Sequence, residues 1–422
     1  MMVRLIPFAL AATFATALIA QTPRQWTTDE LEQARAQVLA LGSLTDPPVV
    51  RSEHGGPAAI TPGSLQAVYF DALKHKGRAT RAFALVELPA TAAANRKVPG
   101  IVLVHGGGGS AFEEWVKLWV ARGYAAISIA VEGQTNERNA AAKDQDNPSG
   151  WKRHAWAGPR RVGIYGDSAE PLKDQWMYHA VADTVLANSL LRSLPGVDAD
   201  KIGVMGISWG GVITSTVIGI DDRFAFAIPT YGCGDLAEAG NQYGRALGNN
   251  QLYRQVWDPM VRMHRVKTPT LWLSWPGDQH FPVDNQAACY RAAPGPHLVT
   301  LIPGMKHGHG AGWKPPDSYA FAESVVQTRA PWCQQTGIQA DGGLARVRFR
   351  ATKPIEKAVL ISTTDLGFTG HRQWTNTPAI LELAQEGVTV EAELPPRTTA
   401  WFVNLHSGDL IASSDFFETK TE

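Results

Sequence analysis

Cysteine is scarce in this sequence, and neither sign of charge is in surplus. The 422 residues include three cysteines, Cys233, Cys289 and Cys333, which allow at most one disulfide within the chain. We consider Cys289–Cys333 as that pair, although spacing does not select it, and no cysteine cluster has the spacing of a zinc site. Lysine plus arginine and aspartate plus glutamate each number 39, which excludes the basic surface typical of nucleic-acid-binding proteins. The fold therefore depends on its hydrophobic core, and no nucleic-acid partner is expected.

A long hydrophobic run is also missing, apart from a short one at the N-terminus. The first four residues carry a positive charge, residues 5–19 are apolar, and small residues follow, with cleavage expected after Ala20 or Ala17. The run is too short to span a membrane comfortably, so a membrane anchor is the weaker interpretation. We expect a signal peptide over residues 1–20, export to the periplasm or the medium, and no membrane association after cleavage.

Internal repeats and low-complexity tracts are absent, and the pattern changes along the chain instead. Residues 21–64 predict a helix from Gln25 to Leu41 and an extended Pro/Gly-rich segment. Over residues 65–335, a hairpin is followed by short apolar runs that alternate with helix-length segments, which is typical of a parallel sheet with helices on both faces. Residues 340–422 contain strand-like runs between turns. The expected fold is α/β, a mostly parallel central sheet flanked by helices, followed by a small antiparallel β-sandwich.

The expected elements are as follows. Strands are predicted over 65–71, 81–88, 98–104, 123–130, the run ending at 206, 224–228, 270–274 and 298–302, and in the sandwich over 345–350, 357–362, 388–394 and 399–405. Helices are predicted over 113–122, 172–193, 212–219 and 282–293.

A polar segment, residues 132–173, interrupts the alternation of strands and helices. Structureless inserts of this length in compact domains are usually functional or disordered. We interpret it as a cap-like insert facing the substrate, with a plain surface excursion as the alternative. Its Trp151 and Trp156, together with Trp275 and His280 further along, are candidate substrate contacts, because exposed aromatic rings stack on sugars.

The pentapeptide Gly206-Ile-Ser-Trp-Gly210 follows a buried apolar run and precedes an apolar helical segment. In this context the G-x-S-x-G pattern is typical of a nucleophile elbow, in which the serine sits at a strained strand-to-helix turn. The helix N-terminus would direct backbone N–H groups and its positive dipole end toward Ser208. The alternative for the motif by itself is a glycine-rich turn with an incidental serine.

An elbow serine requires a base and an acid, in the order Ser, Asp, His. Asp278 follows the strand 270–274, and His307 follows the strand 298–302. Since the carboxyl ends of parallel strands share one edge of the sheet, both side chains are expected near Ser208. Asp284 is the less favoured acid because it falls in the next helix. For Asp278 itself, a plain turn-forming role is the alternative.

His309 is expected to support this site rather than to act as its base. A His-x-His pair such as His307 and His309 also suits a metal, but no third ligand lies near it in sequence, so no metal or other cofactor is expected.

Stabilising a tetrahedral oxyanion takes about two preorganised N–H donors. One is expected from the backbone of Trp209, and the other from Gly107 or Gly108 in the run His105-Gly-Gly-Gly-Gly109. Glycine runs after strands also cradle phosphate, but the P-loop lysine and the spaced dinucleotide glycines are missing. An oxyanion hole is therefore the favoured interpretation.

Taken together, these motifs resemble those of the α/β-hydrolase superfamily over about residues 65–330. Within it, His105–Gly109, Gly206–Gly211 and Pro303-Gly-Met-Lys-His307 are similar to the dienelactone hydrolase and acetyl xylan esterase-like branch, with prolyl-oligopeptidase-type hydrolases close by. The resemblance implies a nucleophile Ser208, an acid Asp278, a base His307 and an acyl-enzyme. Two features depart from these families: dienelactone hydrolases use cysteine as nucleophile, and prolyl peptidases carry a large N-terminal propeller. The β-rich tail resembles accessory domains of exported polysaccharide-acting esterases.

The sequence therefore predicts an exported serine carboxylic-ester hydrolase, in particular a carbohydrate acetyl esterase that acts on a small ester or an esterified polysaccharide. An exopeptidase or amidase with the same triad is one alternative, and a catalytically silent carbohydrate-binding protein is another. The sequence does not predict the oligomeric state.

Overall fold

The computed structural model describes residues 25–144, 147–384 and 387–419, so the expected signal peptide lies outside the described residues. Near the start, α1 (Thr28–Leu39) begins at a capping box, in which Thr27 and Glu30 each accept a backbone N–H of the other. The helix η1 (Ala40–Ser43), the short strand β1 (Val50–Arg51) and the hairpin of β2 (Gln66–His75) and β3 (Arg78–Glu87) follow.

The core is one large sheet in the spatial order β1-β2-β3-β5-β4-β8-β9-β10-β11. Pairing is parallel from β5 to β11 and antiparallel among the first four strands, as expected for a mostly parallel sheet. The parallel strands are β4 (Val98–Val104), β5 (Ala125–Ala130), β8 (Val197–Ile207), β9 (Phe226–Thr230), β10 (Thr270–Ser274) and β11 (His297–Leu301).

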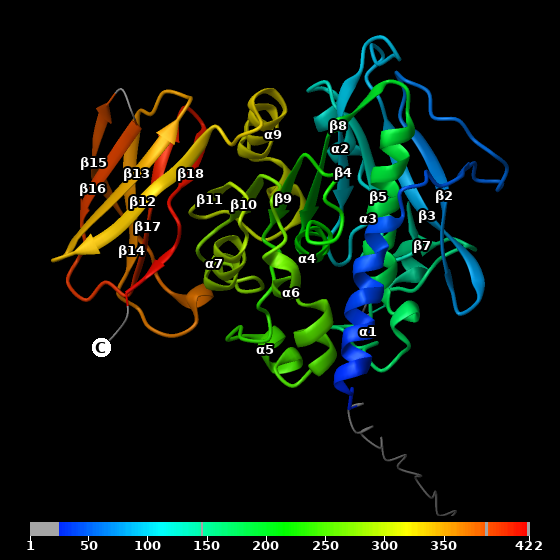
Figure 1. Ribbon diagram of the computed structural model, residues 1–422, viewed down its shortest axis with the longest axis horizontal. Coiled ribbons are helices and arrows are strands. Elements are labelled where there is room, and N and C mark those ends of the chain that lie inside the picture. Colours follow the sequence, from blue (N-terminus) through cyan, green and yellow to red (C-terminus); the bar gives the residue numbers. More distant parts are fainter. Residues whose placement is uncertain (1–24, 145–146, 385–386, 420–422) are drawn as a thin grey trace, which may run out of the picture.

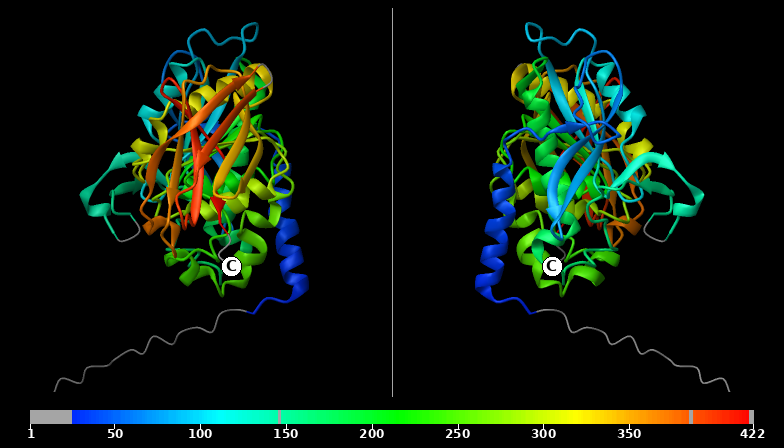
Figure 2. Two further views of the ribbon diagram at one scale, coloured as in Figure 1. Left: turned by 90° about the vertical axis from the view of Figure 1, so that its left-hand side faces the viewer. Right: turned by 90° about the vertical axis from the view of Figure 1, so that its right-hand side faces the viewer.

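Helices cover both faces of this sheet (Figures 1 and 2). Alternate strand residues point to opposite sides, so Ile101 and Leu103 pack in one hydrophobic cluster while Val102 and Val104 pack in the other. The first cluster includes side chains of α2 (Glu113–Val120) and α9 (Asp317–Thr328), and the second includes those of α3 (Trp176–Ser193), α4 (Trp209–Val217) and α7 (Val283–Ala292). Short helices α5 (Gln242–Leu247), η4 (Tyr253–Trp257), α6 (Met260–Met263) and α8 (His309–Trp313) lie in the connections.

The segment 132–173 contains local structure rather than one long loop. Its strands β6 (Gln134–Arg138) and β7 (Trp151–Arg153) pair antiparallel, and η2 (Ala140–Ala142) lies between them, with η3 (Leu172–Asp174) just before α3. Figure 2 shows this hairpin projecting from the body of the molecule.

The C-terminal part is an antiparallel β-structure in the order β12-β13-β16-β15-β14-β17, with β18 and β19 both pairing with β17. Its first strand begins at Cys333, earlier than the expected start at 340. The strands are β12 (Cys333–Asp341), β13 (Leu344–Ala351), β14 (Lys357–Thr363), β15 (Thr375–Ala384), β16 (Gly387–Glu393), β17 (Ala400–Ser407), β18 (Leu410–Ser413) and β19 (Phe417–Glu418), with η5 (Thr369–His371) between β14 and β15.

This β-sandwich covers the edge of the core sheet. Strand β18 pairs with the edge strand β11 at Val299 and Ser413, and Asn404 Nδ2 donates to Leu301 O at 2.9 Å. An exposed strand edge is a template for aggregation, so the sandwich protects the last parallel strand. Figure 1 shows the two parts side by side along this edge.

All three cysteines are free and buried, so the pairing Cys289–Cys333 is wrong. Cys289 packs in the α7 cluster, where its Sγ accepts the N–H of Gly234, whereas Cys333 begins β12 in the other cluster. No helix within the described ranges is both long and apolar enough to cross a bilayer.

Candidate active site

The serine at the end of β8 occupies a strained backbone position. Ser208 has φ 59° and ψ −119°, a region that non-glycine residues seldom adopt, and α4 begins at the next residue, Trp209. The expected helix start at Val212 is therefore three residues late, because the elbow turns directly into the helix. A Cβ on Gly206 would come within 2.0 Å of Gly210 O, and one on Gly210 would come within 2.0 Å of Val104 O. Both glycines are thus required by the close backbone contacts of the turn.

Three side chains from separate loops meet at this corner. Ser208 Oγ lies 2.9 Å from His307 Nε2, and His307 Nδ1 lies 2.9 Å from Asp278 Oδ2. The loops follow the parallel strands β8, β10 and β11, whose carboxyl ends lie at one edge of the sheet, so the sheet order brings the loops together. Asp284 lies in the first turn of α7 and accepts a hydrogen bond from Thr369 instead.

The carboxylate of Asp278 is fully buried and fixed in orientation. Its Oδ1 accepts the backbone N–H groups of His280 at 2.8 Å and Phe281 at 2.9 Å, which leaves Oδ2 directed at His307. Two N–H donors compensate for burying the negative charge.

Aromatic rings surround His307 and restrict its rotation. The rings of Tyr231, His280 and Phe281 lie with centroids 4.5, 4.7 and 5.9 Å away. Tyr231 Oη donates to the carbonyl of Gly308, the residue after the histidine. The imidazole is therefore presented to Ser208 in one orientation.

His309 holds the glycine-rich loop instead of approaching Ser208. Its Nε2 accepts the backbone N–H of Gly106 at 2.9 Å. Burial, with the nearby His307, lowers the pKa of His309 to about 4, so the ring is neutral and accepts this bond at neutral pH. His105 is fully buried, and burial lowers its pKa to about 3. It donates from Nδ1 to Gly106 O, and its Nε2 accepts Val131 N–H.

The rest of the glycine-rich loop is held from the segment 132–173. Gly108 has φ +69° and its carbonyl accepts bonds from Ser149 Oγ at 2.8 Å and Trp151 Nε1 at 2.9 Å. Gln134 Nε2 donates to Gly109 O at 2.7 Å. The loop is thereby fixed along its length before any substrate arrives.

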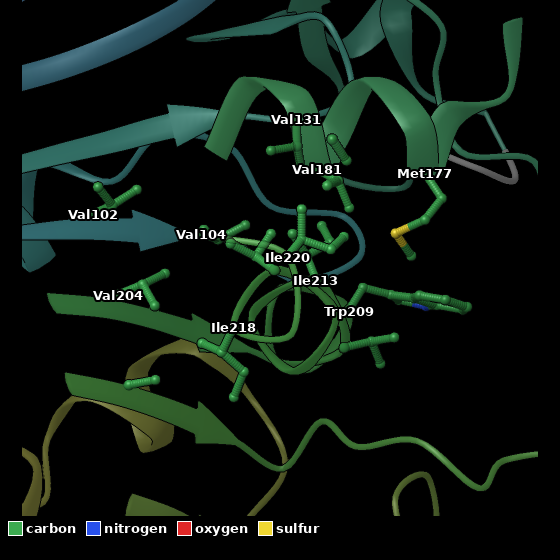
Figure 3. Packing of buried hydrophobic residues seen from close by; sticks show 14 of the residues in the cluster. Val102, Val104, Val131, Met177, Val181, Val204, Trp209, Ile213, Ile218 and Ile220 are labelled. Atoms are coloured by element: carbon green, nitrogen blue, oxygen red, sulfur yellow. The ribbon is translucent and has the colours of Figure 1, made fainter. Parts of the chain in front are cut away.

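Of the three expected oxyanion donors, Gly107 lies beside Trp209, and Gly108 is held by the segment 132–173. A Cβ on Gly107 would meet Trp209 Cδ1 and Arg161 Nη2, each at 3.1 Å. Trp209 is the first residue of α4, where helix N–H groups have no acceptor within the helix. Its indole packs against the ring of Trp176, near Met177 (Figure 3).

The four candidate substrate contacts occupy different places. Trp151 is buried and bonded to Gly108 O, so its ring supports the loop. Trp156 packs against Tyr69 and beneath Arg81 at the β2–β3 hairpin. His280 is exposed at the side of His307, and Trp275 is half-buried against the turn at Gly277.

Several residues at the site were not found from the sequence. Tyr231 directly follows β9, and its position at the carboxyl end of a parallel strand was the one feature of the sequence that could have indicated a role at the site. Arg161, Gln134 and Ser149 carried no local signal, since their roles come from the folding of the segment 132–173 over the glycine-rich loop.

A metal-binding arrangement is not found at this site. In the described ranges, no three histidine, cysteine, aspartate or glutamate side chains gather in a way that suits a metal ion. His307 and His309 use their ring nitrogens in separate hydrogen bonds, to Ser208 and Asp278 on one side and to Gly106 on the other.

Comparison with known proteins gives two family matches. Residues 65–233 match the acetyl xylan esterase family (AXE1), and residues 165–323 match the prolyl oligopeptidase family. No curated protein matches the sequence.

Solved structures share this fold. The acetyl xylan esterase from Paenibacillus sp. R4 superposes with a TM-score of 0.50 at 20% identity, over 68% of this chain and 92% of that one. Acetyl xylan esterase 1 from Thermoanaerobacterium sp. JW/SL YS485 superposes with a TM-score of 0.49 at 18% identity, over 67% of this chain and 89% of that one. An acylaminoacyl peptidase from Pyrococcus horikoshii has a TM-score of 0.45 at 18% identity, over 62% of this chain and 42% of that one.

The elbow, the order of the sheet and both family matches all indicate a serine hydrolase. The chain is a serine hydrolase with the α/β-hydrolase fold, and it is similar to the acetyl xylan esterase family over residues 65–233 and to the prolyl oligopeptidase family over residues 165–323.

Proposed function

We propose that this protein is an exported carboxylic-ester hydrolase that removes acetyl or similar small acyl groups from a polysaccharide. The observation that carries the proposal is the continuous hydrogen-bonded chain from Ser208 through His307 to Asp278, at an elbow with a strained serine. Such a chain activates a hydroxyl that is otherwise a poor nucleophile.

The first half of the reaction forms an acyl-enzyme. Ser208 Oγ attacks the ester carbonyl carbon while His307 Nε2 takes the hydroxyl proton, and the buried carboxylate of Asp278 stabilises the resulting imidazolium. The tetrahedral intermediate collapses, the C–O bond to the alcohol breaks, and His307 returns the proton to the leaving oxygen.

In the second half, water takes the place of the alcohol. His307 removes a proton from the water as it attacks the acyl carbon, and Ser208 leaves with the proton, which releases the acid. During both halves the oxyanion is stabilised by the backbone N–H of Trp209 and by Gly107 or Gly108. Because the loop is already fixed, these donors need little reorganisation.

The carbohydrate substrate is supported by the match to the acetyl xylan esterase family over residues 65–233. Acetate release from acetylated xylan and from p-nitrophenyl acetate by the purified protein tests it. Ser208→Ala should lower kcat by about 10⁴-fold or more, whereas Ser64→Ala, at an exposed position, should not. Full activity in the Ser208→Ala protein would refute the mechanism.

Peptidase or amidase activity is a second candidate, favoured by the prolyl oligopeptidase match over residues 165–323. Aminoacyl p-nitroanilides should be turned over far more slowly than p-nitrophenyl acetate. Turnover of amides alone would reverse this assignment, and a protein that resists labelling by a fluorophosphonate would have a binding role instead.

A further inference from the structure

A loop of the C-terminal β-sandwich reaches the acid of the triad. The segment 364–374 connects β14 to β15 and contains η5, and it leaves the sandwich toward α5 and α7 (Figure 1, orange). Although they lie in a connecting loop, Thr369 and Gly370 are buried. Something in the catalytic core therefore covers them.

That covering is the loop that carries Asp278. A Cβ on Gly370 would come within 2.6 Å of Asp278 O and 3.0 Å of Gln279 Cα, so the two backbones are in direct contact. Beside this contact, Thr369 Oγ1 donates to Asp284 Oδ1 at 2.5 Å, in the first turn of α7. Only a residue without a side chain fits at position 370.

On its other side, the Asp278 loop is held by the core. Asn241 Nδ2 donates to Gln279 O at 2.8 Å and to His280 O at 2.9 Å. Phe368 packs against Gly240, the neighbour of Asn241, with its ring 3.2 Å from the position of a Cβ there. The acid loop is thus clamped between the core and the sandwich.

The clamping loop is itself firmly held in the sandwich. Arg372 donates to Gly367 O from Nε at 2.9 Å and from Nη2 at 2.7 Å, and pairs with Glu418 of β19 at 2.8 Å. Thr399 Oγ1 also donates to Asp365 O at 2.5 Å. Because the loop is fixed to the sandwich in this way, the sandwich determines where the loop contacts the Asp278 loop.

We infer that Thr369 and Gly370 are positioning residues for Asp278, so that the β-sandwich completes the active site of the hydrolase. The inference rests on the proposed function of the triad. Small displacements of a catalytic group lower turnover strongly, because the reacting geometry must be preorganised.

The test uses full-length variants assayed on p-nitrophenyl acetate. Gly370→Ala, whose methyl group would press on Asp278 O, should lower kcat about 10- to 100-fold with KM nearly unchanged. Thr369→Val should lower kcat by a smaller factor than Gly370→Ala does. Thr369→Ser, which keeps the hydroxyl, should have a kcat close to that of the wild type. Controls in the sandwich are Gly337→Ala, where a Cβ meets just the Arg348 side chain, and Thr398→Val, which loses a local bond to Pro395 O. Both should keep the wild-type kcat.

The pH profile separates positioning from simple damage to the fold. A carboxylate held less closely to His307 stabilises the imidazolium less, so the base stays neutral to lower pH. The acid limb of kcat/KM should therefore move to lower pH in Gly370→Ala and Thr369→Val while the plateau falls.

Folded variants with wild-type kcat and an unmoved acid limb would overturn the inference, and so would a fall in kcat without movement of that limb. If Gly370→Ala does not fold, the Thr369→Val and Thr369→Ser pair decides. These outcomes leave the proposed function intact, since that is tested separately by Ser208→Ala, by the choice of ester or amide substrate and by fluorophosphonate labelling of the wild-type protein.

Discussion

At the scale of single residues, the two histidines of the Pro303–Gly310 loop show how a fold separates similar groups. His307 contacts Ser208 and Asp278, whereas His309, two residues on, begins α8 and accepts the N–H of Gly106. One therefore serves as the base and the other as a support of the oxyanion loop. The sequence order of the pair favoured this division, but only the fold supplies the partner of His309.

Replacing His309 should impair turnover without removing the triad. His309→Ala frees the N–H of Gly106 and leaves a cavity beside the loop, so we expect kcat on p-nitrophenyl acetate to fall about 10- to 100-fold. His307→Ala should reach the level of Ser208→Ala, because these residues act as a unit. His264→Ala, an exposed control, should keep full activity. Equal losses for His307→Ala and His309→Ala would contradict the separate roles.

At the scale of elements, the strands that carry the site were predictable and the segment 132–173 was not. Runs such as 270–274 are apolar on both faces, so burial alone fixes them as strands, and β10 has these same bounds. The hairpin of β6 and β7 is polar and depends on bonds to the glycine-rich loop, such as Trp151 Nε1 to Gly108 O. Sequence periodicity does not report contacts of this kind. The strand β15 was missed for a similar reason, since most of its side chains are exposed and its pattern is irregular.

Trp151 links this hairpin to the loop, and its hydrogen bond can be removed separately from its bulk. Trp151→Phe deletes the bond to Gly108 O but keeps an aromatic ring, so we expect kcat to fall about 3- to 10-fold, in keeping with the loss of one bond worth about 1 kcal/mol. If Trp151 stacked on sugar instead, KM for acetylated xylan would rise while p-nitrophenyl acetate turnover stayed unchanged. Trp156→Phe, at a ring that packs against the β2–β3 hairpin, is the matched control and should leave kcat on both substrates unaltered.

At the scale of the whole molecule, buried titratable groups make stability depend on pH in two opposite ways. Burial lowers the pKa of four histidines to about 3 or 4, so stability is lost as pH falls from about 6.5 toward those values, because the unfolded chain binds the protons. These are His105, His154, His179 and His309. Asp183 on α3 acts in the other direction, since burial raises its pKa to about 8, and within the described residues its Oδ1 has no hydrogen-bond partner. The folded protein keeps a proton there that the unfolded chain releases near pH 4, so its stability falls as pH rises through that interval.

The contribution of Asp183 is isolated by comparing the wild type with Asp183→Asn, because the histidines contribute equally to the free energy of unfolding of both proteins. Relative to Asp183→Asn, the free energy of unfolding of the wild type should fall by up to about 1.4 kcal/mol per pH unit, or about 2 kcal/mol between pH 6.5 and 8. The Asp183→Asn variant carries no titrating proton at this position, so its chemical denaturation should lack the fall due to Asp183 and show only the gain from the histidines over the same range. Asp222→Asn, at an exposed position, should follow the wild type. A wild-type slope retained in Asp183→Asn would show that another group releases the proton, and that α3 holds Asp183 as a carboxylate.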